Sequence, residues 1–172
     1  MKHRDIQPAH EEAVLDSFSD YLKKQGDSLK VISRPDPPDA IVTINSKSCW
    51  IEITDAFQSS DWAKSITSYA ADDKTHEPYA RGAICEPDIE ACEKVKEVIF
   101  KKYRKRTMRN LRITNGPGIL LVGAYTPITS PEEIIEQAGH SICSAIASGE
   151  PVFGSIYLYR NSKQGHLFSK LF

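Results

Sequence analysis

Apolar residues recur along the chain with two different spacings, and these spacings predict an alternation of helices and strands. Apolar residues three and four positions apart, as on one face of a helix, predict helices. We expect helices at residues 8–25, 60–71, 88–108 and 131–148. Short runs rich in β-branched and aromatic residues predict strands. We expect strands at residues 29–33, 39–44, 48–54, 119–125, 152–159 and 166–172.

The order of these elements predicts an α/β fold in a single domain over residues 1–172. Three strands in succession come before helices, and the next strand, 119–125, is a continuous apolar run of the kind that is covered on both faces. A helical crossover into such a strand implies a central mixed β-sheet flanked by helices on both faces. A chain of 172 residues buries enough surface to form its own core.

Two carboxylates lie at the starts of adjacent predicted strands. Asp39 follows Pro38 at the start of one strand, Glu52 lies in the next, and an Asn-Ser-Lys-Ser turn joins the two as a hairpin. Carboxylates held side by side repel each other unless a cation lies between them, and Mg²⁺ prefers one or two carboxylates together with water and substrate phosphate. The pair suggests a metal-dependent phosphodiesterase. The alternative is that Asp39 caps a strand and that Glu52 is an exposed strand residue.

These residues resemble the PD-(D/E)XK nuclease superfamily, whose signature is Pro-Asp on one strand and Asp or Glu, any residue, then Lys on the next. Here Pro38-Asp39 and Glu52-Ile53-Thr54 match the signature, with Thr54 in place of the lysine. The order of elements over about residues 8–159 is also that of restriction endonuclease-like folds. The resemblance implies such a fold and a divalent-metal-dependent nuclease that hydrolyses phosphodiester bonds in DNA. It further implies that Asp39 and Glu52 are catalytic and bind Mg²⁺ or Mn²⁺.

The resemblance also indicates where to look for the missing lysine, because some members of the superfamily carry it on the helix that follows the catalytic strands. Lys102 continues a stripe of apolar residues at helical spacing, formed by Val95, Val98 and Ile99. Lys101 falls on the solvent side of the same helix. We therefore expect Lys102 to extend its ammonium over the carboxylates as a catalytic residue. The alternative is that Lys102 extends into solvent near the helix end.

An acidic residue also occurs on the apolar stripe of the first predicted helix. Glu11 lies three positions before Val14 and four before Leu15, whereas Glu12 is displaced toward solvent. In the superfamily a glutamate on the opening helix often completes the acidic cluster, so the resemblance implies a catalytic role for Glu11, or for Glu12 if the helix is rotated. The alternative is a first-turn acid that interacts with the helix dipole.

Positive charge is concentrated in one stretch of a chain whose net charge is only −1. Residues 94–112, here called the basic segment, contain nine basic residues and one acidic residue, a local charge of +8. Such a segment neutralises phosphates and releases counterions. We expect Lys101, Arg104, Lys105 and Arg109 to bind nucleic acid. The alternative is a solvated helix face.

Composition indicates which cellular environment and which partners we expect for the protein. The four cysteines form no Cys-x-x-Cys pair and no apolar leader or long apolar run is present, so we expect a reduced, cytoplasmic protein without a membrane. The serines lack the Gly-x-Ser-x-Gly context of many serine hydrolases. DNA is the expected partner, with RNA and a homodimer left open. Thr54 favours the alternative function, a catalytically inactive nuclease-fold protein that acts as a nucleic-acid- or protein-binding module.

Overall fold

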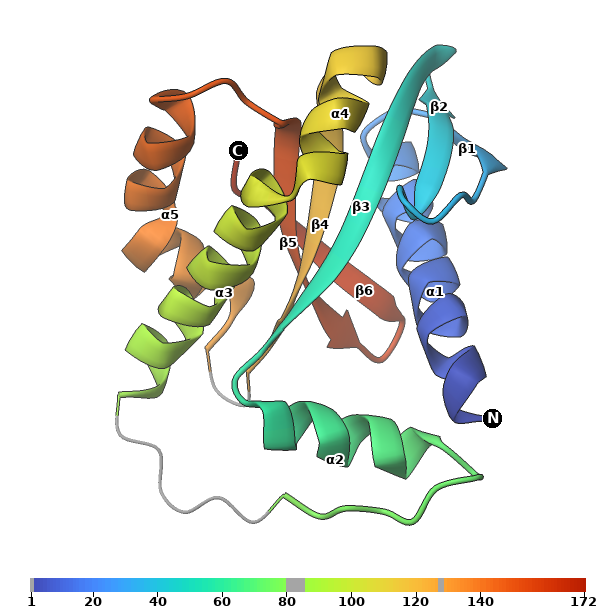
Figure 1. The fold of residues 1–172 in the computed structure, drawn as a ribbon, viewed down its shortest axis with the longest axis vertical. Coiled ribbons are helices and arrows are strands. Elements are labelled where there is room, and N and C mark those ends of the chain that lie inside the picture. The colour runs from blue at the N-terminus through green and yellow to red at the C-terminus, as the bar shows by residue number, and fades with distance from the viewer. Residues whose placement is uncertain (1, 80–85, 127–128) are drawn as a thin grey trace.

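The computed structural model describes residues 2–79, 86–126 and 129–172, and its strands form one mixed sheet (Figure 1). The elements in chain order are α1 (His3–Lys24), β1 (Leu29–Ser33), β2 (Ala40–Ile44), β3 (Lys47–Phe57), α2 (Ser60–Ala70), α3 (Pro87–Arg104), α4 (Arg106–Asn115), β4 (Gly118–Tyr125), α5 (Pro131–Ala147), β5 (Phe153–Ser162) and β6 (Gly165–Lys170). The sheet order follows the sequence from β1 to β6. β3, β4 and β5 run parallel and the other pairs are antiparallel. The predicted α/β class with a mixed sheet is confirmed.

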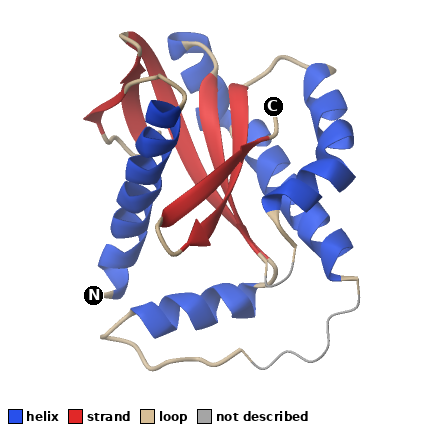
Figure 2. Cartoon of the chain, turned by 180° about the vertical axis from the view of Figure 1, so that it is seen from behind, coloured by secondary structure: helices blue, strands red, loops and turns tan. Residues whose placement is uncertain are grey.

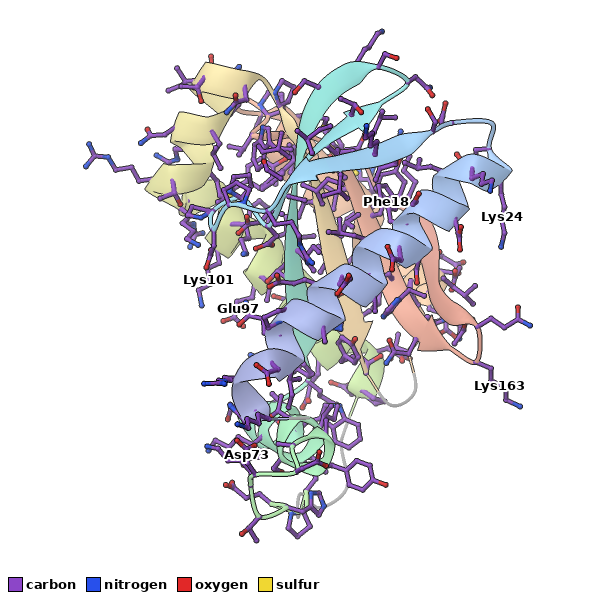
Figure 3. The ribbon with its side chains drawn as sticks, turned by 90° about the vertical axis from the view of Figure 1, so that its right-hand side faces the viewer. Phe18, Lys24, Asp73, Glu97, Lys101 and Lys163 are labelled. Atoms are coloured by element: carbon purple, nitrogen blue, oxygen red, sulfur yellow. The ribbon has the colours of Figure 1, made fainter. Side chains whose placement is uncertain are left out.

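Helices cover both faces of this sheet, as the continuous apolar run of β4 predicts. Leu120 and Val122 of β4 pack in one core with α3, α4 and α5. Ile119 and Leu121 point to the other face and pack in a second core with α1. Successive strand residues point to opposite faces, so a strand apolar at every position needs a cover on each side. Figure 2 shows α1 alone on one face, and Figure 3 shows its path across the sheet.

A tight turn places β2 beside β3 and sets the register on which the candidate site depends. Asn45 and Ser46 have φ values of 49° and 67°, the left-handed conformation that two-residue hairpin turns require. Ala40 then pairs with Ile51. β3 continues to Phe57, and from Glu52 onward it pairs with β4, while no strand among the described residues covers its other edge. The second half of β3 therefore has an open edge.

The predicted helix at residues 88–108 is instead two helices, α3 and α4, separated at Lys105. Lys105 has φ −68° and ψ 120°, an extended conformation that ends α3 and redirects the chain. Ile99 on α3 and Met108 on α4 are both fully buried in the same core. Nine positions turn an α-helix by about two and a half turns, so one continuous helix would point Met108 away from the core that holds Ile99. The break at Lys105 allows both side chains to be buried.

Candidate functional site

A cavity of about 660 Å³ lies along the open edge of β3. Its walls include Glu11 of α1, Thr54 of β3, Ile66 of α2 and Lys102 of α3. α2 crosses the end of the sheet next to this edge (Figure 1). Because β2 stops short of this part of β3, side chains from both faces of β3 reach the same cavity.

Lys102 forms an ion pair with Glu52 beside this cavity. The Lys102 Nζ lies 2.6 Å from Glu52 Oε1 and 3.4 Å from the carbonyl oxygen of Ile53. The side chain of Glu52 is 3% exposed and that of Lys102 is 18% exposed. Val95 and Ile99, which define the inward stripe of α3, are fully buried. The structure therefore places Lys102, the lysine that helical spacing predicts, next to Glu52, the second carboxylate of the signature. The catalytic role of Lys102 stays a prediction.

Asp39, the residue immediately before β2, approaches the same part of β3. Its Oδ2 accepts a hydrogen bond of 2.6 Å from the backbone N–H of Ile53, on the open edge of the strand. Burial raises the pKa of Asp39 most and the negative charge of Glu52 raises it further, while the bond from Ile53 lowers it, so that the value is about 6. Glu52 therefore lies close enough to Asp39 to disfavour the charged form of Asp39. A bound cation would relieve this repulsion.

One oxygen of this carboxylate pair lacks a partner among the described residues, and carboxylate oxygens are the ligands that a hard divalent cation prefers. Glu52 Oε2 is buried and has no hydrogen-bond partner among the described residues, although Oε1 is bonded to Lys102. The described residues contain no group of three or more His, Cys, Asp or Glu side chains that could hold a metal ion. A metal here would therefore use Asp39 and Glu52, with water and phosphate oxygens as its other ligands. This is the ligand set that Mg²⁺ prefers.

Glu11 lines the cavity, whereas Glu12 is exposed. The Glu11 carboxylate accepts a 2.8 Å hydrogen bond from the Gln7 amide, and its Oε2 lies 3.9 Å from the Arg34 guanidinium. Its charge is a further cause of the raised pKa of Asp39. Glu11 therefore adds negative charge next to the carboxylate pair, and no hydrogen bond joins it to either member.

Comparison of the chain with family models, with curated proteins and with solved structures found no match. The resemblance to the PD-(D/E)XK superfamily therefore stays a prediction that depends on Pro38-Asp39, Glu52 and the element order. Within residues 2–79, 86–126 and 129–172, no helix has the length and apolar character needed to cross a membrane.

The basic segment forms the C-terminal half of α3 and all but the last turn of α4, and its cations differ in their partners. Lys101, Arg104 and Lys105 are exposed and form no ion pair with any described residue, and Lys101 is labelled in Figure 3. Arg109 donates a 3.1 Å hydrogen bond to the backbone carbonyl of Tyr103. Arg112 lies 3.0 Å from Glu150. The exposed cations remain available to phosphates, and their role in nucleic-acid binding stays a prediction.

Sequence reasoning missed a second polar cluster, which lies on the α1 face of the sheet and also reaches the cavity. Asp55 of β3 accepts a 2.6 Å hydrogen bond from the Tyr159 hydroxyl, and its Oδ2 lies 3.1 Å from His10 Nε2. Burial lowers the pKa of His10, but the hydrogen bond and charge of Asp55 outweigh burial, so the pKa is raised. Gly123 makes room for the cluster, because a Cβ there would overlap Asp55 Oδ1. His10 and Asp55 both line the cavity.

Proposed function

We propose that this protein is a divalent-metal-dependent nuclease with a restriction endonuclease-like fold that hydrolyses phosphodiester bonds in DNA. The observation that carries the proposal is the 2.6 Å contact between Lys102 Nζ and Glu52 Oε1. In this proposal Lys102 of α3 takes the role of the signature lysine, whose position is occupied by Thr54. Asp39, the residue before β2, completes the set. Two carboxylates next to a lysine that lines the cavity are the groups that metal-assisted phosphodiester hydrolysis needs.

Each residue has a chemical task in this mechanism. Asp39 and Glu52 hold the metal, which supplies an activated water and neutralises charge on the scissile phosphate when bound. Lys102 stabilises the negative charge that develops on the phosphoryl oxygens and orients the attacking water. Glu11 adds negative potential beside Asp39, which favours a cation at this position. The exposed cations of the basic segment hold the phosphates of the substrate backbone.

The alternative function is a catalytically inactive nuclease-fold protein that binds nucleic acid or protein. The same ion pair favours it, because Lys102 already neutralises Glu52 and a cation would have to compete with the ammonium. Incubation of the protein with single- and double-stranded DNA in Mn²⁺ separates the two functions. Products that form with Mn²⁺, stop with a chelator and fail to form with Asp39→Asn support the nuclease. No cleavage of DNA or RNA by the wild type would leave only the binding role.

Metal binding is expected to raise the melting temperature of the wild type and to leave that of Asp39→Asn unchanged. Removal of one carboxylate relieves repulsion in the metal-free protein, so the variant should melt at or above the wild-type temperature without metal. Differential scanning fluorimetry with Mg²⁺ or Mn²⁺ measures both effects. Asp36→Asn, at an exposed carboxylate three positions earlier, is the matched control and should keep the full metal response.

The pH dependence of this metal response has a defined sign. The pKa of Asp39 is raised from 3.8 to about 6, so below pH 6 a metal must displace a proton and its stabilising effect should shrink. Without metal the sign is reversed: the contribution of Asp39 to stability is fully present below pH 3.8 and is lost as the pH rises through 6. Asp39→Asn should remove both dependences. An equal metal shift on either side of pH 6 would contradict Asp39 as a ligand.

Alanine substitutions in the basic segment are expected to weaken nucleic-acid binding without regard to sequence. For duplex DNA, the slope of log affinity against log salt should fall by about 0.9 for each phosphate that the variant no longer neutralises. The substituted residues are Lys101, Arg104, Lys105 and Arg109. The matched controls are Lys24→Ala and Lys163→Ala, at exposed lysines that Figure 3 labels away from Lys101. Fluorescence anisotropy titrations give the slopes, and equal slopes in both sets would indicate that the segment is a solvated surface.

A further inference from the structure

The cavity that contains Lys102 is also lined by aromatic rings. Phe57 ends β3 and Tyr125 ends β4, and the parallel register sets these two residues side by side. Their rings stack with centroids 4.9 Å apart and planes 18° from parallel. Asn161 of β5 borders the cavity beside them, where its Oδ1 accepts a 3.3 Å hydrogen bond from the Tyr125 hydroxyl. One wall of the cavity is therefore a stacked aromatic pair with an amide at its edge.

This wall is held in place by the rest of the fold. The centroid of the His10 ring lies 6.1 Å from that of the Tyr125 ring. His10 is in turn paired with the Asp55 carboxylate and hydrogen-bonded to the Tyr159 hydroxyl. Tyr159 is fully buried, so this support belongs to the core of the α1 face. The rings are thus preorganised, and a ligand that stacks on them does not have to order them first.

A second hollow of about 260 Å³ adjoins this wall. It shares Tyr125 and Asn161 with the main cavity and adds Trp62 of α2 and the cation of Arg160. The amide nitrogen of Asn161 donates to no residue in the described part of the chain, so it is free to bind an acceptor on a ligand. The two hollows together therefore present aromatic rings, an amide and a cation on the side of the cavity that Tyr125 and Asn161 line.

We propose that Phe57, Tyr125 and Asn161 form a subsite for an unpaired nucleobase and that the substrate is single-stranded nucleic acid. This inference rests on the proposed nuclease function and names its substrate class. A stacked ring pair is extended by a third flat ring, and base stacking on aromatic side chains is the usual basis of single-strand binding. The Asn161 amide meets the hydrogen-bonding edge of the base, while the phosphates lie toward Lys102 and the basic segment.

The size and walls of the cavity favour an unpaired nucleotide over a duplex. A volume of about 660 Å³ falls in the range of small-ligand pockets. Residues of α1 and α2 border it, and α2 lies across the end of the sheet (Figures 1 and 2). A base inside a duplex is stacked on both faces and offers proteins its groove edges, whereas a base in a single strand offers a free face. Ring stacking therefore requires an unpaired base.

Binding in the presence of EDTA tests the subsite without cleavage. The probes are a short fluorescein-labelled oligothymidine, the same strand with abasic positions, and a hairpin duplex. We expect the wild type to bind oligothymidine about tenfold more tightly than the abasic strand. Phe57→Leu and Tyr125→Leu should lose about that factor for oligothymidine and almost nothing for the abasic strand or the duplex. Tyr69→Leu, at a tyrosine of α2 that is 81% exposed and lines neither hollow, should change none of the three affinities.

Two further arms keep the test decisive. Asn161→Ala alters an exposed side chain and should weaken oligothymidine binding by about threefold, so one arm does not depend on replacing a packed ring. Equal wild-type affinity for the intact and abasic strands, or equal losses in Tyr125→Leu and Tyr69→Leu, would overturn the subsite. Metal-dependent cleavage, measured separately, would then still stand. Base-selective binding without any cleavage would keep the subsite and overturn the nuclease.

Discussion

Replacement of Lys102 by methionine is expected to lower the rate of metal-dependent cleavage by about 10²- to 10³-fold, with nucleic-acid affinity changed by no more than about twofold. The ammonium contacts Glu52 beside the cavity, and in the proposed mechanism it acts on charge that develops during the reaction. A group of this kind contributes little to ground-state binding. Single-turnover cleavage gives the rate and anisotropy gives the affinity. Lys163→Met, at an exposed lysine that does not line the cavity, should leave the rate close to that of the wild type.

The same substitution is expected to destabilise the fold by about 3 kcal/mol, because it leaves a buried carboxylate without its partner. Glu52 is 3% exposed, and its Oε2 already lacks a hydrogen-bond partner in the described part of the chain. The double variant Glu52→Gln with Lys102→Met should regain most of this stability and none of the activity. Urea unfolding measures the difference. Wild-type cleavage by Lys102→Met would show that the ion pair is structural and that Lys102 has no catalytic role.

Periodicity predicted the sheet and most helices because burial in this fold follows local spacing. The continuous apolar run of β4 indicated a cover on both faces, and two helical layers provide it. The break at Lys105 was not predicted, since it depends on where Met108 finds the core. That is a property of the packed chain, and the sequence around Lys105 contains neither glycine nor proline to indicate an end.

The placement of Lys102 was accessible from the sequence for the same reason. Helical spacing fixes the face of a residue, and Val95 and Ile99 mark the inward face of α3. The hairpin turn likewise fixed the neighbourhood of Asp39 and Glu52. What the sequence could not provide was the distance between groups that lie fifty positions apart, such as Lys102 and Glu52.

The cluster of His10, Asp55 and Tyr159 escaped prediction because no local spacing relates its members. Asp55 is separated from His10 by 45 positions and from Tyr159 by 104. Two weak signals were present: an acid inside the apolar strand β3 and a glycine inside the apolar strand β4. The parallel register pairs these two residues, Asp55 and Gly123. A glycine within a strand often marks the close approach of another group, and here that group is the Asp55 carboxylate.

Gly123→Ala is accordingly expected to destabilise the protein by about 3 kcal/mol, the upper end of the usual range for overpacking. The new Cβ would overlap Asp55 Oδ1, and it would lie 2.7 Å from the Tyr125 ring and 2.9 Å from the Tyr159 ring. Tyr159 is fully buried and Tyr125 is stacked on Phe57, so neither ring moves aside freely. Thermal and urea unfolding measure the loss. Gly139→Ala is the matched control, because its Cβ meets its nearest neighbours at 3.4 Å and alanine favours the helix.

The effect on base binding distinguishes two glycine substitutions in β4 that lie on opposite faces of the sheet. Gly123→Ala should reduce the preference for oligothymidine over the abasic strand, because the clash displaces Tyr125 from its stack. Gly118→Ala provides a comparison of similar severity elsewhere, since its Cβ would overlap the buried Trp50 ring. It should destabilise the fold without changing the preference for bases. If Gly123→Ala kept the full preference while Gly118→Ala lost it, the aromatic wall beside Asp55 would have no part in substrate binding.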